Sequence, residues 1–233
     1  KKYDNYLTRD SFVAKYPFVD YQFEMFTQAM RGLSDNDLFT GRHSSVGARS
    51  LLGVCQQIAQ ELTDDELGTV ASFDRFYDGI AAMLKSDVKD NIGRAAQDSR
   101  TRDPFTMGVL KVLLLVRYVD SFQAYPCNIA VLLRRSLNQD ATDLETRVKR
   151  ALHILADQVY VQRQADGTYA YMTNEEKEVR REISQIVVEP REVTDLLRAD
   201  IRRHAGTSVA SFVYPGTNRS IDRKSTRLNS SHS

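Results

Sequence analysis

The pattern of apolar and polar residues after position 104 predicts three helices. An apolar run at 109–119 is too short and too charged to cross a bilayer, which favours a buried helix. A second apolar segment follows at 128–135. The third helix is predicted by an apolar stripe at helical spacing, formed by Leu144, Val148, Ala151, Leu152 and Leu155.

Two β-rich segments, 159–164 and 168–172, follow these helices and flank Asp166-Gly167. Asp-Gly between such segments predicts a hairpin with a type I′ turn, in which both central residues have positive φ. Three helices and then a hairpin are the order of elements in a winged helix, a small module that binds nucleic acid or docks within larger assemblies. We therefore predict a winged-helix domain over residues 104–173.

Capping residues predict where two of these helices begin. Asn128 lies just past Pro126 and is placed as the N-cap of the second helix. Thr142 and Glu145 have the spacing of a capping box, in which each side chain accepts a hydrogen bond from the other residue's backbone N–H. The third helix is therefore expected to begin directly after Thr142.

The region 1–103 is predicted to be mainly helical. Apolar residues at helical spacing predict helices over 19–32 and 48–62. Thr63–Glu66 has the pattern of another capping box and predicts a helix that continues to about residue 88, with Leu67 on its apolar face. The polar stretch 85–103 is expected to be a fraying helix and a linker.

The chain after the hairpin is predicted to hold connecting helices and the start of a further domain, over 174–221. Thr173–Glu176 is a capping pattern for a helix that reaches about residue 188, an amphipathic helix follows Pro190, and 211–214 is expected to be a strand without a partner. Residues 222–233 resemble the translation of a sequencing-library adaptor, so we treat them as a non-native tail. Because no initiating Met is present, we expect an internal piece of a longer protein.

Composition and charge are ordinary for a globular protein. The chain has 233 residues, with 42% hydrophobic and 27% charged residues. The tail carries three of the 32 basic and one of the 31 acidic residues, which leaves 29 basic and 30 acidic residues elsewhere. Overall charge therefore does not favour a nucleic-acid or membrane partner. Two cysteines without a C-x-x-C pattern, and no signal peptide or apolar span, favour a cytoplasmic location.

Motifs for catalysis or metal binding are missing from the sequence. The pattern G-x-x-x-x-G-K-[ST], whose backbone and lysine hold phosphates, does not occur, and no apolar strand ends in paired carboxylates for Mg²⁺. This chain alone is therefore not expected to hydrolyse ATP. His43, His153 and His204 are isolated from one another and predict no metal site. Cys55 and Cys127 are interpreted as small core residues rather than nucleophiles.

Six segments in one collinear order carry a family resemblance. They are Tyr16–Phe23, Gly41–Gly53, Val109–Leu113, Tyr160–Arg163, Met172–Glu178 and Phe212–Arg219. Together they resemble the BrxC/PglY family of large P-loop ATPases from BREX bacteriophage-exclusion systems. The resemblance covers nearly everything before the tail, with two departures: family members often carry Glu where Ala48 stands and Phe where Cys55 stands.

The resemblance implies that the parent protein is an AAA+-like ATPase that uses ATP and Mg²⁺. It also implies partners, namely DNA and other BREX proteins including a DNA methyltransferase, and a homo-oligomer formed through the ATPase, with no membrane partner. This piece would follow the nucleotide-binding core. The expected fold is mainly α: a helical AAA+ lid-like region, the winged helix with its small β-hairpin, and a truncated α+β segment.

Arg49 and Arg42 are the candidates for nucleotide sensing that the resemblance supplies. Both lie in a Gly/Ser-rich loop that leads into a helix, and a guanidinium matches phosphate oxygens in a planar, bidentate way. The residues alone favour the plainer interpretation of a solvated loop arginine or an ion pair at a helix start. With the resemblance, Arg49 stands ahead of Arg42.

The candidates for DNA contact are basic residues off the apolar stripe of the third helix, together with one on the wing. They are Arg147, Lys149, Arg150, His153 and Arg163. Such side chains can meet phosphates in a salt-dependent way. However, residues 106–173 hold eight Lys or Arg and six Asp or Glu, a mixture that is typical of a solvated helix face. Docking within the parent protein or onto a partner is therefore favoured over DNA contact.

Two alternative functions stay open. The chain could be a stand-alone winged-helix transcriptional regulator, or a purely structural docking module without any ligand. The missing Met, the adaptor-like tail and the long helical region before residue 104 argue against the stand-alone regulator. Fold alone does not decide between the remaining functions.

Overall fold

One helix, α6 (Pro104–Val116), lies at the centre of the first of two units into which the chain divides. The computed structural model describes residues 8–41, 48–185, 190–205, 211–213 and 220–222. The first unit comprises residues 1–180 and the second residues 181–233, and each is described by itself. As the sequence predicts, the described chain is mainly α.

The helices and strands follow one another in a simple order. The first unit contains α1 (Arg9–Lys15), α2 (Asp20–Asp35), α3 (Ala48–Glu61), α4 (Arg75–Ile80), a 3₁₀ helix η1 (Ala81–Met83), α5 (Ser86–Gln97), α6, α7 (Pro126–Leu132), α8 (Ala141–Asp157), β1 (Val161–Arg163) and β2 (Tyr169–Tyr171). Helix α9 (Asn174–Gln185) begins in the first unit. The second unit contains α10 (Pro190–Ala205), β3 (Ser211–Val213) and β4 (Ser220–Asp222).

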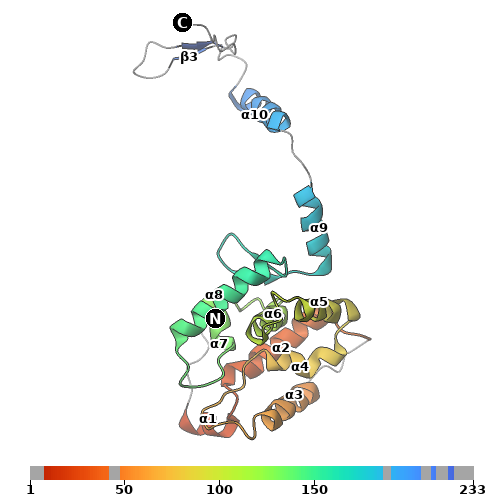
Figure 1. Ribbon diagram of the computed structural model, residues 1–233, viewed down its shortest axis with the longest axis vertical. Helices are drawn as coiled ribbons and strands as arrows, with labels where there is room; N and C mark the ends of the chain where they lie inside the picture. Colours follow the sequence, from red (N-terminus) through yellow and green to blue (C-terminus); the bar gives the residue numbers. More distant parts are fainter. Residues whose placement is uncertain (1–7, 42–47, 186–189, 206–210, 214–219, 223–233) are drawn as a thin grey trace. The chain divides into compact units, whose positions relative to one another are not determined.

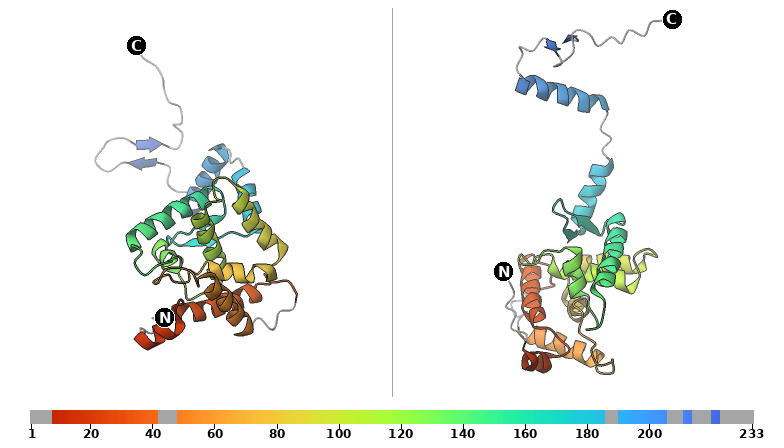
Figure 2. Two further views of the ribbon diagram at one scale, coloured as in Figure 1. Left: turned by 60° about the horizontal axis from the view of Figure 1, so that its bottom comes forward. Right: turned by 90° about the vertical axis from the view of Figure 1, so that its left-hand side faces the viewer.

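Helix α6 is apolar on every face, which explains its central position. Ten of its thirteen residues are buried, whereas a helix at a surface buries one stripe. It contacts α2, α4, α5, α7, α8 and β2, and the views of Figures 1 and 2 show these elements around it. Asp103 is its N-cap and accepts a hydrogen bond from the backbone N–H of Thr106, and Pro104 occupies the first turn.

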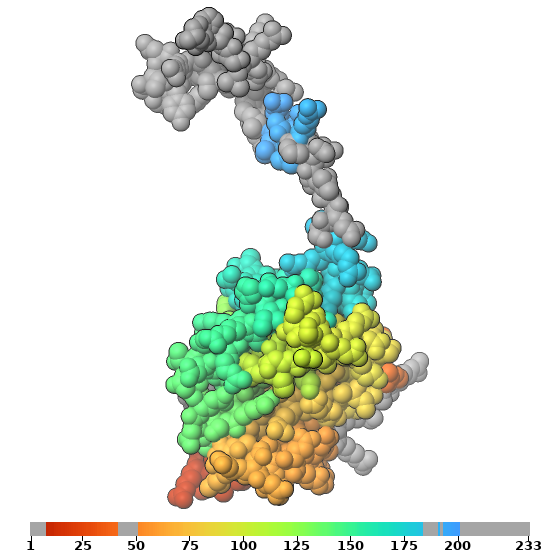
Figure 3. All heavy atoms as spheres, viewed as in Figure 1, coloured from red at the N-terminus to blue at the C-terminus, as the bar shows by residue number. Residues whose placement is uncertain are grey.

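The three helices and the hairpin predicted after residue 104 are all present. Helix α8 contacts α6, α7 and β1, and its predicted apolar stripe is buried against them. Figure 3 shows α8 along the surface of this unit. The predicted domain boundary at 103/104 falls inside the first unit, between α5 and α6, and one hydrophobic core extends across it from Phe18 to Tyr171.

Both predicted N-caps in this segment are wrong by a few residues. Helix α7 begins at Pro126, so Asn128 lies within its first turn and its side chain donates to the carbonyl of Gln123. Helix α8 begins at Ala141 because Asp140 caps it, with its carboxylate 2.8 Å from the backbone nitrogen of Asp143. Thr142 is therefore inside the helix, where its capping role is lost.

The hairpin is present, but its turn differs from the type I′ prediction. Strands β1 and β2 pair antiparallel, with Val161 opposite Tyr171 and Arg163 opposite Tyr169. Gly167 has a φ of +87°, whereas Asp166 has no positive φ. The backbone N–H of Gly167 donates to the carbonyl of Gln164, so the loop is a β-turn followed by a left-handed glycine.

The predicted helix from residue 63 does not form, because the chain turns at 62–68 and then pairs with the end of α7 and the segment that follows it. Thr63 donates its hydroxyl proton to the carbonyl of Ala59 at the end of α3, and Leu67 is 95% exposed. The backbone N–H groups of Val70 and Phe73 donate to the carbonyls of Arg135 and Leu132. Helical structure resumes only at α4.

The stretch expected to be a fraying helix and linker is also ordered. Residues 86–97 form α5, whose inner face buries Val88, Asn91, Ile92 and Ala95.

After the hairpin the Thr173–Glu176 capping box is confirmed: the Glu176 backbone N–H donates to the Thr173 hydroxyl, and the Thr173 backbone N–H donates to the Glu176 carboxylate.

The described residues of the second unit comprise the end of α9, helix α10 and one strand pair. Helix α10 confirms the helix predicted after Pro190, and Val193, Leu196 and Leu197 are exposed on it. Strand β3 pairs antiparallel with β4, so the expectation of a strand without a partner is wrong. Asp222, assigned to the tail, ends β4. Within the described ranges, no helix has the length and apolar character needed to cross a membrane.

Candidate functional site

The two arginines proposed to sense nucleotide cannot be placed in a site. Arg42 lies outside the described residues, and Arg49 lies in the first turn of α3 with a side chain that is also outside them. Both therefore stay predictions. Among the side chains that the structure describes, no group of three or more His, Cys, Asp or Glu residues could hold a metal ion.

Four of the five candidates for DNA contact lie on the exposed side of α8, opposite the buried stripe. Three of these four already have partners. The ammonium group of Lys149 lies 2.7 Å from the Glu145 carboxylate, and His153 Nδ1 lies 3.0 Å from the Asp157 carboxylate. The guanidinium of Arg147 lies 4.2 Å from the centroid of the Phe105 ring, at the distance of a cation–π contact.

Arg150 on α8 and Arg163 on β1 differ from these three. Both side chains are exposed, and neither has an ion pair or a hydrogen bond with another described residue. Of the five candidates, Arg150 and Arg163 are therefore the two without a partner among the described residues. A weakly charged face suits a protein partner better than the DNA backbone, for which affinity depends on the number of phosphates neutralised.

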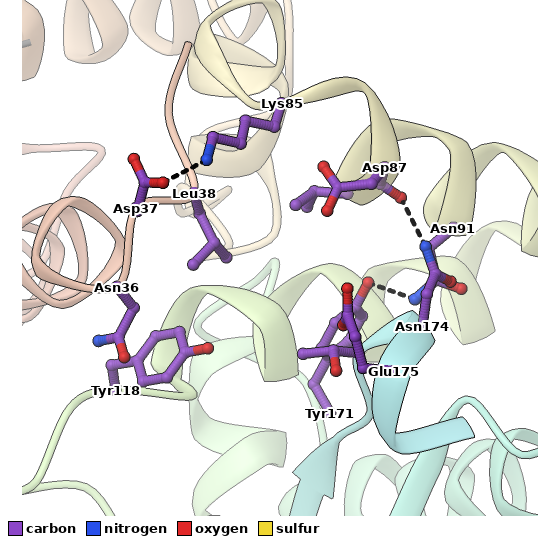
Figure 4. Close-up of a pocket in the computed structure, with 12 residues that line it drawn as sticks. Asn36, Asp37, Leu38, Lys85, Asp87, Asn91, Tyr118, Tyr171, Asn174 and Glu175 are labelled. Atoms are coloured by element: carbon purple, nitrogen blue, oxygen red, sulfur yellow. Dashed lines mark hydrogen bonds and ion pairs between the residues drawn. The ribbon is translucent and has the colours of Figure 1, made fainter. Parts of the chain in front are cut away.

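A pocket of about 230 Å³ lies where the end of α2, the start of α5 and the start of α9 meet. No prediction placed a site here, because its residues come from four separate parts of the sequence. It is lined by Asn36, Asp37, Leu38, Lys85, Asp87, Val88, Asn91, Tyr118, Tyr171, Thr173, Asn174 and Glu175. In Figure 4 the ion pair of Asp37 and Lys85 lies on one side, and Asn91, Tyr171 and Glu175 lie on the other.

The wall of this pocket is a network of buried polar groups around Asn91, which is 2% exposed. The Asn91 amide Nδ2 donates to the Tyr171 hydroxyl at 2.5 Å and to the carbonyl of Met172 at 3.2 Å. Its Oδ1 accepts a hydrogen bond from the ammonium group of Lys177. The network ties α5 to the hairpin and to α9, so all three elements fix the wall of the pocket.

Burial changes the protonation behaviour of this network. Desolvation, with a further contribution from Arg94, lowers the pKa of Lys177 to about 8. The Lys177 ammonium group lies 3.8 Å from the centroid of the Tyr160 ring, which favours its charged form. Burial also raises the pKa of Tyr171, so its hydroxyl keeps its proton at neutral pH. Hydrogen bonds from its own backbone N–H and from Thr173 lower the pKa of Glu175, which is therefore ionised.

The sequence does contain a pattern that places Asn91 in the interior. Val88, Ile92 and Ala95 recur at four and three residues within a polar stretch, and Asn91 lies on the same helical face. An asparagine on such a face needs partners for its amide, which is the property that makes it a candidate for a polar site.

Neither family models nor solved structures add to this description of the pocket. No protein-family model matches the sequence, and no solved structure matches the fold. The relation to BREX ATPases therefore stays a prediction from the resemblance.

Proposed function

We propose that this chain is the part of a BREX-type ATPase that follows the nucleotide-binding core, and that residues 104–173 form a winged helix that docks onto a protein partner. Two observations support the winged helix. Helices α6, α7 and α8 precede the β1–β2 hairpin along the chain, and α8 contacts both other helices and β1. A third helix packed in this way presents its outer face to a ligand.

The pairing of charged side chains on that outer face favours a protein partner over DNA. Glu145 forms an ion pair with Lys149, the Asp157 carboxylate lies 3.0 Å from His153 Nδ1, and Arg147 is held against Phe105. DNA binding draws its affinity from unpaired cations that release counterions, whereas a protein interface accepts mixed charges around a few arginines. Among BREX components, the DNA methyltransferase is the partner that the resemblance implies.

The docking proposal is tested by calorimetric titration of the chain with the methyltransferase of the same BREX system. Arg150→Glu should weaken the complex at least tenfold, because arginines at interface centres carry much of the binding energy. Arg31→Glu on α2 is the matched control, because Arg31 is also exposed but lies off this face, and it should leave binding unchanged. The proposal is wrong if the two proteins form no complex, or if both variants lose the same amount of binding affinity.

DNA contact is the second candidate, and the unpaired Arg150 and Arg163 are the observation that favours it. Fluorescence anisotropy with a short duplex, repeated over a range of KCl concentrations, decides this point. If the face binds DNA, Arg150→Ala combined with Arg163→Ala should weaken binding and reduce the salt dependence by about two phosphate contacts. If the chain does not bind the duplex even at the lowest salt concentration, DNA contact by this face is excluded.

The lid-like region is proposed to sense nucleotide in the parent protein through Arg49, with Arg42 second. The chain lacks the residues that cradle phosphates, so ATP and Mg²⁺ belong to the parent, which we propose to be cytoplasmic. Arg49→Ala in the full-length ATPase should lower ATP turnover, and unchanged turnover would end this role. A homo-oligomer through the ATPase belongs to the same proposal.

Two other functions are compatible with the same fold: a stand-alone winged-helix transcriptional regulator and a structural docking module without a ligand. The genomic neighbourhood separates them from the BREX proposal. A methyltransferase gene and a phosphatase-like gene beside the coding sequence favour phage defence, whereas an isolated gene with an operator site upstream favours the regulator.

A further inference from the structure

Tyr171 lines the pocket between α2, α5 and α9, and its hydroxyl group keeps a proton that it can donate. The Lys177 ammonium group can only donate hydrogen bonds, so it fixes Oδ1 of Asn91 on its own side. The amide nitrogen of Asn91 must then donate to Tyr171, which leaves the phenol as acceptor in that bond. Tyr171 is 3% exposed, lines the pocket, and donates no hydrogen bond to any described residue.

The pocket also carries an excess of negative charge. Three of its side chains are carboxylates and one is an ammonium group. Lys85 pairs with Asp37 at 2.5 Å, so Asp87 and Glu175 have no cationic partner among the described side chains. Their positions in the first turns of α5 and α9 suit the helix dipoles, and the packing of the two helices brings both to one pocket. A cation is favoured here and a phosphate is disfavoured.

The volume of the pocket limits the size of its ligand. At about 230 Å³ it is smaller than the roughly 300–1,000 Å³ of pockets that hold nucleotides or drug-sized molecules. A ligand that pairs with all three of these groups needs an ammonium group for Asp87 and Glu175. Close beside it, the ligand also needs an acceptor for the Tyr171 hydroxyl. An α-amino amide, in which a carbonyl lies one carbon away from the ammonium group, has both features in a compact form.

We propose that this pocket binds an α-ammonium group together with its adjacent carbonyl, with Asp87 and Glu175 holding the cation and the Tyr171 hydroxyl donating to the carbonyl oxygen. This chemistry occurs in free amino-acid amides and at the amino terminus of a polypeptide. The proposal goes beyond the docking role of the α8 face and does not depend on it, because the two sites share no residue.

Isothermal titration calorimetry of the chain with glycinamide at neutral pH tests the proposal. We expect saturable binding with one site per chain at millimolar concentrations. N-acetylglycinamide, which keeps the carbonyl groups but lacks the cation, should not bind, and ethylammonium, which lacks the acceptor, should bind about tenfold more weakly. Binding of triglycine amide with similar affinity would assign the site to a polypeptide terminus, and binding of glycinamide alone would assign it to a free small molecule.

Three variants connect this binding to the pocket. Tyr171→Phe should weaken glycinamide about tenfold and leave ethylammonium unchanged, because only the hydroxyl is removed. Glu175→Gln combined with Asp87→Asn should abolish measurable binding of both. Glu178→Gln, an exposed position on the same helix that does not line the pocket, is the matched control and should have no effect.

Near-ultraviolet circular dichroism of each variant checks that it is folded. If Tyr171→Phe is not folded, the carboxylate variant provides the test. If the titration with glycinamide gives no saturable heat, the proposal is wrong. Equal binding of N-acetylglycinamide, or wild-type binding by the double carboxylate variant, overturns it as well.

Discussion

Removing the amide of Asn91 should destabilise the first unit more than any exposed change on the same helix. Asn91→Ala leaves the Tyr171 hydroxyl and the Met172 carbonyl, both in residues that are 3% exposed, without the donor that they share. A buried polar group left unpaired costs about 1–3 kcal/mol, and alanine regains about 0.5 kcal/mol of helix propensity. The free energy of unfolding should therefore fall by about 2–5 kcal/mol.

Urea unfolding followed by circular dichroism measures this loss. With an m-value of about 2 kcal/mol/M, the midpoint should fall by about 1–2.5 M. Asp90→Ala, the exposed neighbour on α5, is the control and should change the free energy by less than about 0.5 kcal/mol. In a double-mutant cycle, Tyr171→Phe should cost less when Asn91 is already alanine. A loss below about 1 kcal/mol for Asn91→Ala, or additive losses in the cycle, would refute this account of the network.

Three further predictions concern a helix cap, two glycines and one lysine. Asp140→Ala should lower the free energy of unfolding by about 1 kcal/mol in urea, because α8 loses its cap. Gly32→Ala should lower the melting temperature, since its Cβ would lie 2.6 Å from Tyr118 Cβ, whereas Gly93→Ala has no atom within 4 Å and should raise it. Between pH 8 and 10 stability should rise, because unfolded Lys177 still binds a proton that folded Lys177 has released. Urea midpoints against pH should lose this slope in Lys177→Met.

Local sequence patterns predicted most of the helices in the first unit, including the starts of α3 and α9, but misplaced the starts of α7 and α8. The stripe on α8 is visible because its residues repeat at helical spacing over about three turns. Asp140 and Thr142 are both good capping residues, and the choice between them depends on backbone angles that the sequence does not contain. The same holds for the hairpin, where Asp-Gly predicted the right position and the wrong turn type.

Long-range pairing explains what the sequence could not show. Val70 and Phe73 lie outside any helix because their backbone N–H groups donate to Arg135 and Leu132, at and just after the end of α7. The pocket is a stronger case, since Asp37, Asp87 and Glu175 become neighbours only after α2, α5 and α9 have packed. Propensity is local, and such contacts override it.

The burial of α6 on all sides has a mechanical consequence. A surface helix can slide or tilt at little cost, but ten buried residues of α6 are packed against six other elements at once. Displacing α8 relative to α2 would require all of these contacts to repack. We therefore expect the elements before and after position 104 to move as one body, because α6 contacts both α2 and β2.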